Sequence, residues 1–147
     1  MRKSIIAILM TFCLSIMTYA QTPRDRATEL KEQAQSSLNQ KDYIKARYLF
    51  KKAYEAFATR ENYPQAIECG VQANALYVRE NFYKEGFELC RDMDQLIWAG
   101  EQNQKKVFYD LRFLVNKERL QMYTALKNPA QAKTQLKKLL TLPRMTH

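Results

Sequence analysis

The side chains that carry out most enzymatic chemistry are scarce in this sequence. Its one histidine is His147, and after residue 20 its only serines are the adjacent pair Ser36 and Ser37. A Ser-His-Asp triad needs three such groups brought together, and a histidine-based metal site needs several imidazoles. The sequence therefore predicts no catalytic triad, no metal site and no cofactor, and we expect a protein that is not an enzyme.

Phosphate-binding loops and paired carboxylates are also disfavoured. The glycines lie at positions 70, 86 and 100, too far apart for a glycine-rich phosphate loop. Asp92 and Asp94 come closest to a carboxylate pair. Residues two apart on a helix point in different directions, so we interpret both as part of a solvated face.

Helical periodicity governs the chain after residue 20. Apolar residues recur at three- and four-residue intervals, and the four prolines fall at the edges of these segments. Asp42 is an expected N-cap, and Gly100 is expected just past the end of the fourth helix. The expected helices cover about 23–39, 42–59, 64–79, 82–99, 102–126 and 129–142. Links this short favour antiparallel neighbours, so we expect an all-α fold of helical hairpins.

The first 20 residues have the form of a secretory signal peptide. Arg2 and Lys3 precede an uncharged apolar run, and the small residue Ala20 stands at the expected cleavage point. We therefore expect a signal peptide over residues 1–20 and one domain over residues 21–147. The alternative is an uncleaved membrane anchor, because the uncharged run approaches the length of a short bilayer span.

A positive net charge limits the partners to be expected. The full chain carries +9, and removal of residues 1–20 leaves 22 basic and 15 acidic side chains, or +7. Export to the periplasm or cell envelope of a bacterium argues against nucleic acid and leaves anionic envelope surfaces or acidic protein or peptide segments as partners. The separated lysine pairs, such as Lys51 with Lys52, are interpreted first as solvated faces of helices. Membrane contact is expected only if the first segment stays uncleaved.

Two cysteines remain after cleavage, Cys69 and Cys90, in a compartment that permits disulfides. Their positions place them near one another across an antiparallel helix pair. Two alternatives stay open: a disulfide between them, or two buried thiols packed as small apolar side chains.

A pattern of small and aromatic residues occurs twice, 40 residues apart. Tyr43 and Ala46 return as Tyr83 and Gly86. A fixed period of this size is typical of arrays of helical hairpins.

At Leu30, Ala34, Tyr43, Ala46, Phe50 and Ala53 the chain resembles the tetratricopeptide repeat family. Ala34 and Ala46 fall at the family's two small close-contact positions, whereas the second hairpin has Asn74 and Gly86 there. The resemblance implies hairpins stacked as a right-handed α-solenoid that binds a peptide or protein partner. The period of 40 departs from the family's 34, which indicates an elongated or degenerate version.

In that family, peptides lie on the concave face formed by the first helix of each pair, held by cations and amides. Carried over to this sequence, the resemblance implies a binding face with the following residues. They are Lys31, Gln35 and Asn39 on the first helix, Asn74 and Arg79 on the third, and Lys117 and Gln121 on the fifth.

Leucines crowd the last helix, where a solenoid needs a polar cap. This face would pack against a further domain, a partner or a second copy, so a homo-oligomer through the C-terminal helix is one expectation. For the whole chain, the leading expectation is an exported scaffold that binds a peptide or protein. The alternatives are the sensory segment of a larger envelope receptor, such as a histidine kinase, and, less favoured, a small helical enzyme.

Overall fold

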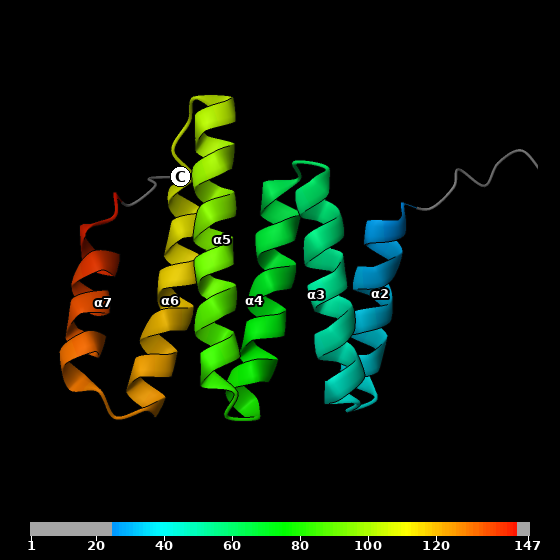
Figure 1. Ribbon diagram of the computed structural model, residues 1–147, viewed down its shortest axis with the longest axis horizontal. Helices are drawn as coiled ribbons and strands as arrows, with labels where there is room; N and C mark the ends of the chain where they lie inside the picture. The colour runs from blue at the N-terminus through cyan, green and yellow to red at the C-terminus, as the bar shows by residue number, and fades with distance from the viewer. Residues whose placement is uncertain (1–24, 144–147) are drawn as a thin grey trace, which may run out of the picture.

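The computed structural model describes residues 25–143, and within them six helices follow one another in antiparallel pairs. Figure 1 shows these helices arranged in chain order, from α2 at one end to α7 at the other. The predicted signal peptide over residues 1–20 lies outside the described residues. The helices are α2 (Arg26–Asn39), α3 (Tyr43–Thr59), α4 (Tyr63–Arg79), α5 (Tyr83–Gln104), α6 (Tyr109–Ala125) and α7 (Pro129–Thr141).

Four of the helix connections use the same turn. In the first, the backbone N–H of Lys41 donates to Leu38 and that of Asp42 donates to Ser37, which is a Schellman ending of α2. The same two bonds recur at the ends of α3, α4 and α6. The residue that enters the left-handed region is in each case not a glycine: Lys41, Glu61, Asn81 and Lys127 have φ between 53° and 63°.

Each of these turns runs directly into the next helix. The side chain of Asp42 accepts a hydrogen bond from the Lys45 N–H, as the sequence predicts for an N-cap. Asn62 caps α4 and Asn128 caps α7 in the same way. In the first connection, Asp42 thus closes the turn after α2 with its N–H and caps α3 with its side chain. A connection this short brings neighbouring helices together as antiparallel pairs.

Consecutive helices pack against one another, and α4 also packs against α6. The first hairpin meets the sequence expectation, because Ala34 and Ala46 are both fully buried. Side chains this small allow two helices to approach closely, and Phe50 fills the adjoining space with 1% of its surface exposed. The second hairpin uses Gly86 similarly: a Cβ there would lie 3.0 Å from Oδ1 of Asn74.

The end of α5 differs from the sequence prediction. Gly100 does not terminate the helix, which continues to Gln104, and the left-handed residue after it is Lys105. Gly100 is instead a site of close contact. A Cβ there would lie 2.7 Å from the Phe108 ring and 2.9 Å from the Tyr63 ring. The expected fifth helix over 102–126 is correspondingly shorter, because α6 begins only at Tyr109.

A buried carboxylate holds the connection between α5 and α6. Glu101 accepts a hydrogen bond from the Phe108 N–H at 2.8 Å and pairs with the Arg112 guanidinium, whose Nε lies 2.7 Å away. The Phe108 ring packs on Tyr63 of α4 with 5.6 Å between ring centroids. The hydrogen bonds with Arg112 are the main reason that the pKa of Glu101 is lowered. This connection is therefore anchored to both flanking helices and to α4.

Both described cysteines are buried, free thiols. Burial raises the pKa of Cys69 to about 11 and that of Cys90 to about 12. At neutral pH both sulfurs therefore stay protonated and unreactive, and they pack as small apolar groups.

Candidate functional site

Helix α4 is enclosed by its neighbours on every side except one. Its exposed residues fall on a single stripe at helical spacing, from Glu68 and Gln72 through Ala75 to Arg79. The residues between them, such as Cys69, Ala73 and Asn74, are fully buried. The stripe therefore marks the most exposed face of α4.

Lys31 joins α2 to this stripe. Its ammonium donates to Gln65 at 2.7 Å and to Glu68 at 2.8 Å, both on α4. These contacts place the Lys31 side of α2 beside the α4 stripe. They also leave Lys31 with part of its charge already neutralised by Glu68.

Helix α6 lies on the other side of α4, in contact through Asn74 and Glu118. Next to Glu118 in the helix, Lys117 is exposed, and Gln121 is exposed one turn later. Among the described residues, Lys117 has no ion-pair partner and Gln121 has no hydrogen-bond partner. We call the exposed surface of these three helices the even-helix face. It consists of Lys31, Gln35, Asn39, Glu68, Gln72, Arg79, Lys117 and Gln121.

The remaining predicted residues of this face differ in the contacts that they already make within the protein. The Gln35 amide donates to Asn39 at 3.1 Å, so these two polar groups partly satisfy each other. The Arg79 guanidinium lies 3.9 Å from the centroid of the Tyr43 ring, which fixes its position while leaving its hydrogen-bond donors exposed. A ligand would therefore meet preformed polar groups at one end of the face and an unpaired cation at Lys117.

Asn74, in contrast, is not part of any surface, which corrects the sequence expectation. It is fully buried, and its amide donates to Oε2 of Glu118 at 3.0 Å. Its position is the small-residue packing position that faces Gly86. An asparagine there holds α4 against α6 and cannot grip a peptide.

Glu118 is an unusual residue beneath the even-helix face, because it is 5% exposed and has no ion-pair partner among residues 25–143. Burial raises its pKa above the ordinary value of 4.5, and the hydrogen bond from Asn74 and the charge of Lys117 only partly oppose this. Oδ1 of Asn74 also has no hydrogen-bond partner within the described residues. A protonated Glu118 adds a donor to a site where an acceptor is unsatisfied.

We expect Glu118 to make the protein less stable as pH rises. Between the unfolded pKa and the higher native pKa, the folded state holds more protons, so the free energy of unfolding falls through this window. Glu118→Gln keeps the shape and removes the titration. Urea unfolding from pH 4 to 8 should show the variant gaining stability relative to the wild type as pH rises. The control Glu88→Gln, at an exposed position on α5, should show no such trend. A Glu118→Gln difference that does not change with pH would contradict the argument.

The chemistry of the even-helix face is that of recognition. Amides can donate and accept hydrogen bonds to an extended backbone, while lysine and arginine attract carboxylates. Among the described residues, no cluster of three or more His, Cys, Asp or Glu side chains could hold a metal ion. Asp94 is occupied by an ion pair with Arg119. None of the helices within residues 25–143 combines the length and the apolarity that crossing a bilayer requires.

Three members of the face and its edge escaped the sequence prediction: Gln65, Glu68 and Gln72. Their helical spacing with Arg79 was available in the sequence, since positions 65, 68, 72, 75 and 79 follow three- and four-residue steps. The sequence did not indicate how α4 is rotated about its axis, and therefore which of its sides faces solvent. That rotation is set by which residues meet α3 and α5.

Comparisons of the chain with protein-family models, with curated proteins and with solved structures found no match in any of the three.

Proposed function

We propose that this protein is an exported scaffold that binds a peptide or a protein segment on its even-helix face and carries out no catalysis. In this proposal the hairpins stack as a tetratricopeptide-like right-handed solenoid, and the protein acts in the cell envelope after loss of residues 1–20. The observation that carries the proposal is the single exposed stripe of α4. It lies between Lys31 of α2 and Lys117 of α6, and it presents amides and cations on rigid helices.

The arrangement of charge favours a peptide with acidic groups. Lys31 forms an ion pair with Glu68, whereas Lys117 forms no ion pair among the described residues. A carboxylate at Lys117 would therefore gain an ion pair without breaking one. Gln72 and Gln121 can then bond to the peptide backbone on either side, because each amide both donates and accepts.

A charge reversal at Lys117 tests the proposal more cleanly than one at Lys31, whose replacement by Glu would also repel Glu68. The probe is a displayed library of random twelve-residue peptides, selected on the wild-type protein. Peptides so selected should bind Lys117→Glu at least tenfold more weakly. They should bind the control Lys51→Glu within about twofold, because Lys51 is exposed on α3, away from this face. Equal weakening by both substitutions, or by neither, would contradict the proposal.

A further inference from the structure

The C-terminal end of the fold carries an apolar stripe. The charged side chains that follow Glu118 in the chain are all basic. Pro129, Ala132, Leu136 and Leu140 fall at helical spacing along one side of α7. Leu136 is 47% exposed and Leu140 is 71% exposed, although both are leucines on a helix that packs against α6. We call these four residues the α7 face.

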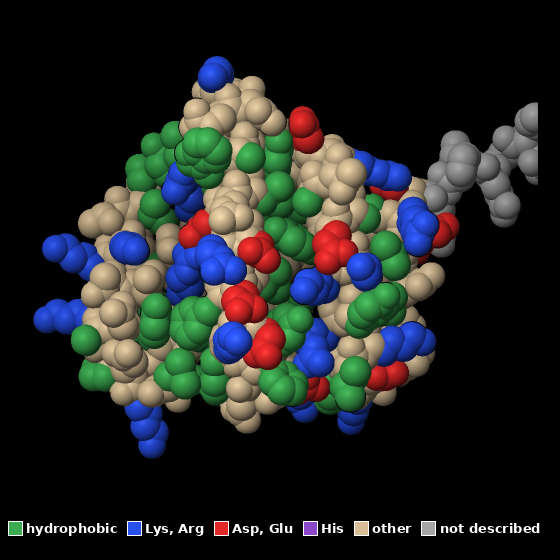
Figure 2. All heavy atoms as spheres, in the orientation of Figure 1, with side chains coloured by type: hydrophobic (Ala, Val, Ile, Leu, Met, Phe, Trp, Pro, Cys, Tyr) green, Lys and Arg blue, Asp and Glu red, His purple; other side chains and the backbone are tan. Residues whose placement is uncertain are grey.

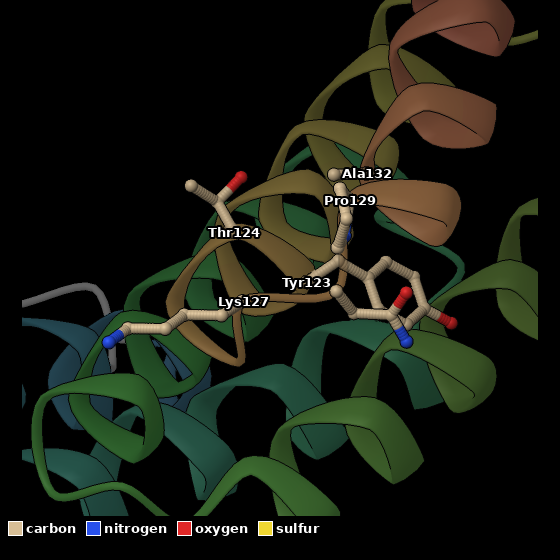
Figure 3. Close-up of a pocket in the computed structure, with 6 residues that line it drawn as sticks. Tyr123, Thr124, Lys127, Pro129 and Ala132 are labelled. Atoms are coloured by element: carbon tan, nitrogen blue, oxygen red, sulfur yellow. The ribbon is translucent and has the colours of Figure 1, made fainter.

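The α7 face leads into a hollow at the turn between α6 and α7. The hollow has a volume of about 470 Å³ and a mainly apolar lining. Figure 3 shows Tyr123 of α6 beside Pro129 and Ala132 of α7, with the Lys127 side chain extending away from them. A space of this size accepts one large apolar side chain from outside. The stripe beyond it can then contact the next turns of a helix that carries that side chain.

The charged side chains that follow Glu118 in the chain have one sign only. No Asp or Glu follows Glu118 in the sequence, whereas six basic residues do. Lys133 and Lys137 each come one position after a member of the α7 face, so they border it along one side. Figure 2 shows Lys and Arg side chains projecting from the α7 end, with no acidic side chain beside them in that view.

From this combination we propose that the α7 face docks an acidic amphipathic helix of a partner protein. The leucines and the hollow receive the apolar side chains of that helix, and its carboxylates meet Lys133 and Lys137. This surface lies on α7 and on its turn with α6, and the docked helix is a second partner segment in addition to the peptide proposed for the even-helix face.

Charge and shape argue against two other occupants. A second copy that met this face symmetrically would bring Lys133 and Lys137 against their own equivalents. A head-to-tail copy would meet α2, which has no large exposed apolar side chain among its described residues. A bilayer would leave the hollow unfilled, and two exposed leucines are a weak membrane anchor.

The test uses a displayed library of designed helices that all carry leucine at i, i+3, i+4 and i+7. Half of the library has Glu at the flanking positions and half has Lys. On the wild-type protein, Glu-flanked helices should be enriched at least tenfold over Lys-flanked ones. The double substitution Lys133→Glu with Lys137→Glu should reverse this preference, and Leu136→Gln with Leu140→Gln should abolish capture. The matched control Ile44→Gln with Tyr48→Gln, two exposed apolar residues of α3, should leave capture unchanged.

All the substituted side chains at α7 are exposed, so circular dichroism and the melting temperature should stay unchanged. Three outcomes would overturn the proposal. The first is equal capture of Glu- and Lys-flanked helices. The second is sedimentation with phosphatidylglycerol vesicles that requires Leu136 and Leu140 while the helices fail to bind. The third is a dimer in analytical ultracentrifugation that Leu136→Gln with Leu140→Gln dissociates.

Discussion

Replacing Phe50 by Ala is expected to lower the free energy of unfolding by about 3–5 kcal/mol, the usual cost of removing a buried aromatic ring. Phe50 is 1% exposed and belongs to the core shared by the first helices. The neighbouring side chains belong to rigid helices joined by tight turns, so they can collapse only partly into the space. A domain of this size is stable by about 5–15 kcal/mol, so the loss is a large part of the total.

Tyr48 provides the matched control for Phe50. It is an aromatic residue on the same helix, two positions earlier, and it is 61% exposed. Tyr48→Ala should change the free energy of unfolding by less than about 1 kcal/mol. Both variants can be measured by urea unfolding with circular dichroism. Similar losses in the two variants would mean that α3 is not packed with Phe50 inward.

The second large effect is expected at Gly100. In Gly100→Ala the new Cβ would meet the rings of Phe108 and Tyr63, neither of which can bend away. Overpacking of this kind costs about 1–3 kcal/mol, only partly offset by the better helix propensity of alanine, about 1 kcal/mol. We expect a net loss of stability. We also expect faster hydrogen exchange at the Phe108 amide, because displacement of the Phe108 ring in the variant would strain the hydrogen bond from this amide to Glu101.

Gly70→Ala is the control for Gly100→Ala, because both glycines lie inside helices and gain the same propensity. The nearest atom to a Cβ at Gly70 is the sulfur of Met93, at 2.6 Å, which is near the end of a flexible side chain. Gly70→Ala should therefore cost less than Gly100→Ala. A larger loss at Gly70 would show that Gly100 is not the tight contact described for it.

Local signals in the sequence predicted much of this fold. Asp42 is an N-cap, Asn128 with Pro129 begins α7, and Ala34 and Ala46 are buried at close contacts. Each of these features depends on residues within one helix or one turn. The sequence therefore holds the relevant physical chemistry locally.

Features that depend on tertiary contact were not predictable in the same way. A glycine at position 100 is compatible both with a helix end and with a close contact between helices. Only the tertiary position of Phe108 shows that the close contact is the correct interpretation. Residues 105–108, which separate α5 from α6, contain no proline or glycine that would indicate a break there. The left-handed residues Lys41 and Glu61 lack the glycine signal, although tyrosines spaced 20 residues apart mark the helix that follows each turn.

In the candidate site, too, local features were predictable from the sequence and tertiary contacts were not. Exposure of Lys117 and Gln121 follows from helical period alone, and the sequence prediction placed them on the surface. Asn74 was placed there too, because the register of α4 is uncertain by one residue until its contact with α6 is known. The Lys31 pairing with Glu68 joins residues 37 positions apart, so no local pattern predicts it.

We propose that a peptide binds across the even-helix face. The most direct measurement is a nuclear magnetic resonance titration of the isotope-labelled protein with a peptide selected on it. We expect amide shift changes concentrated at Gln72, Arg79, Lys117 and Gln121, with little change along α3. Shifts confined to the exposed side of α3, or to α7 alone, would contradict the claim and place the binding surface elsewhere.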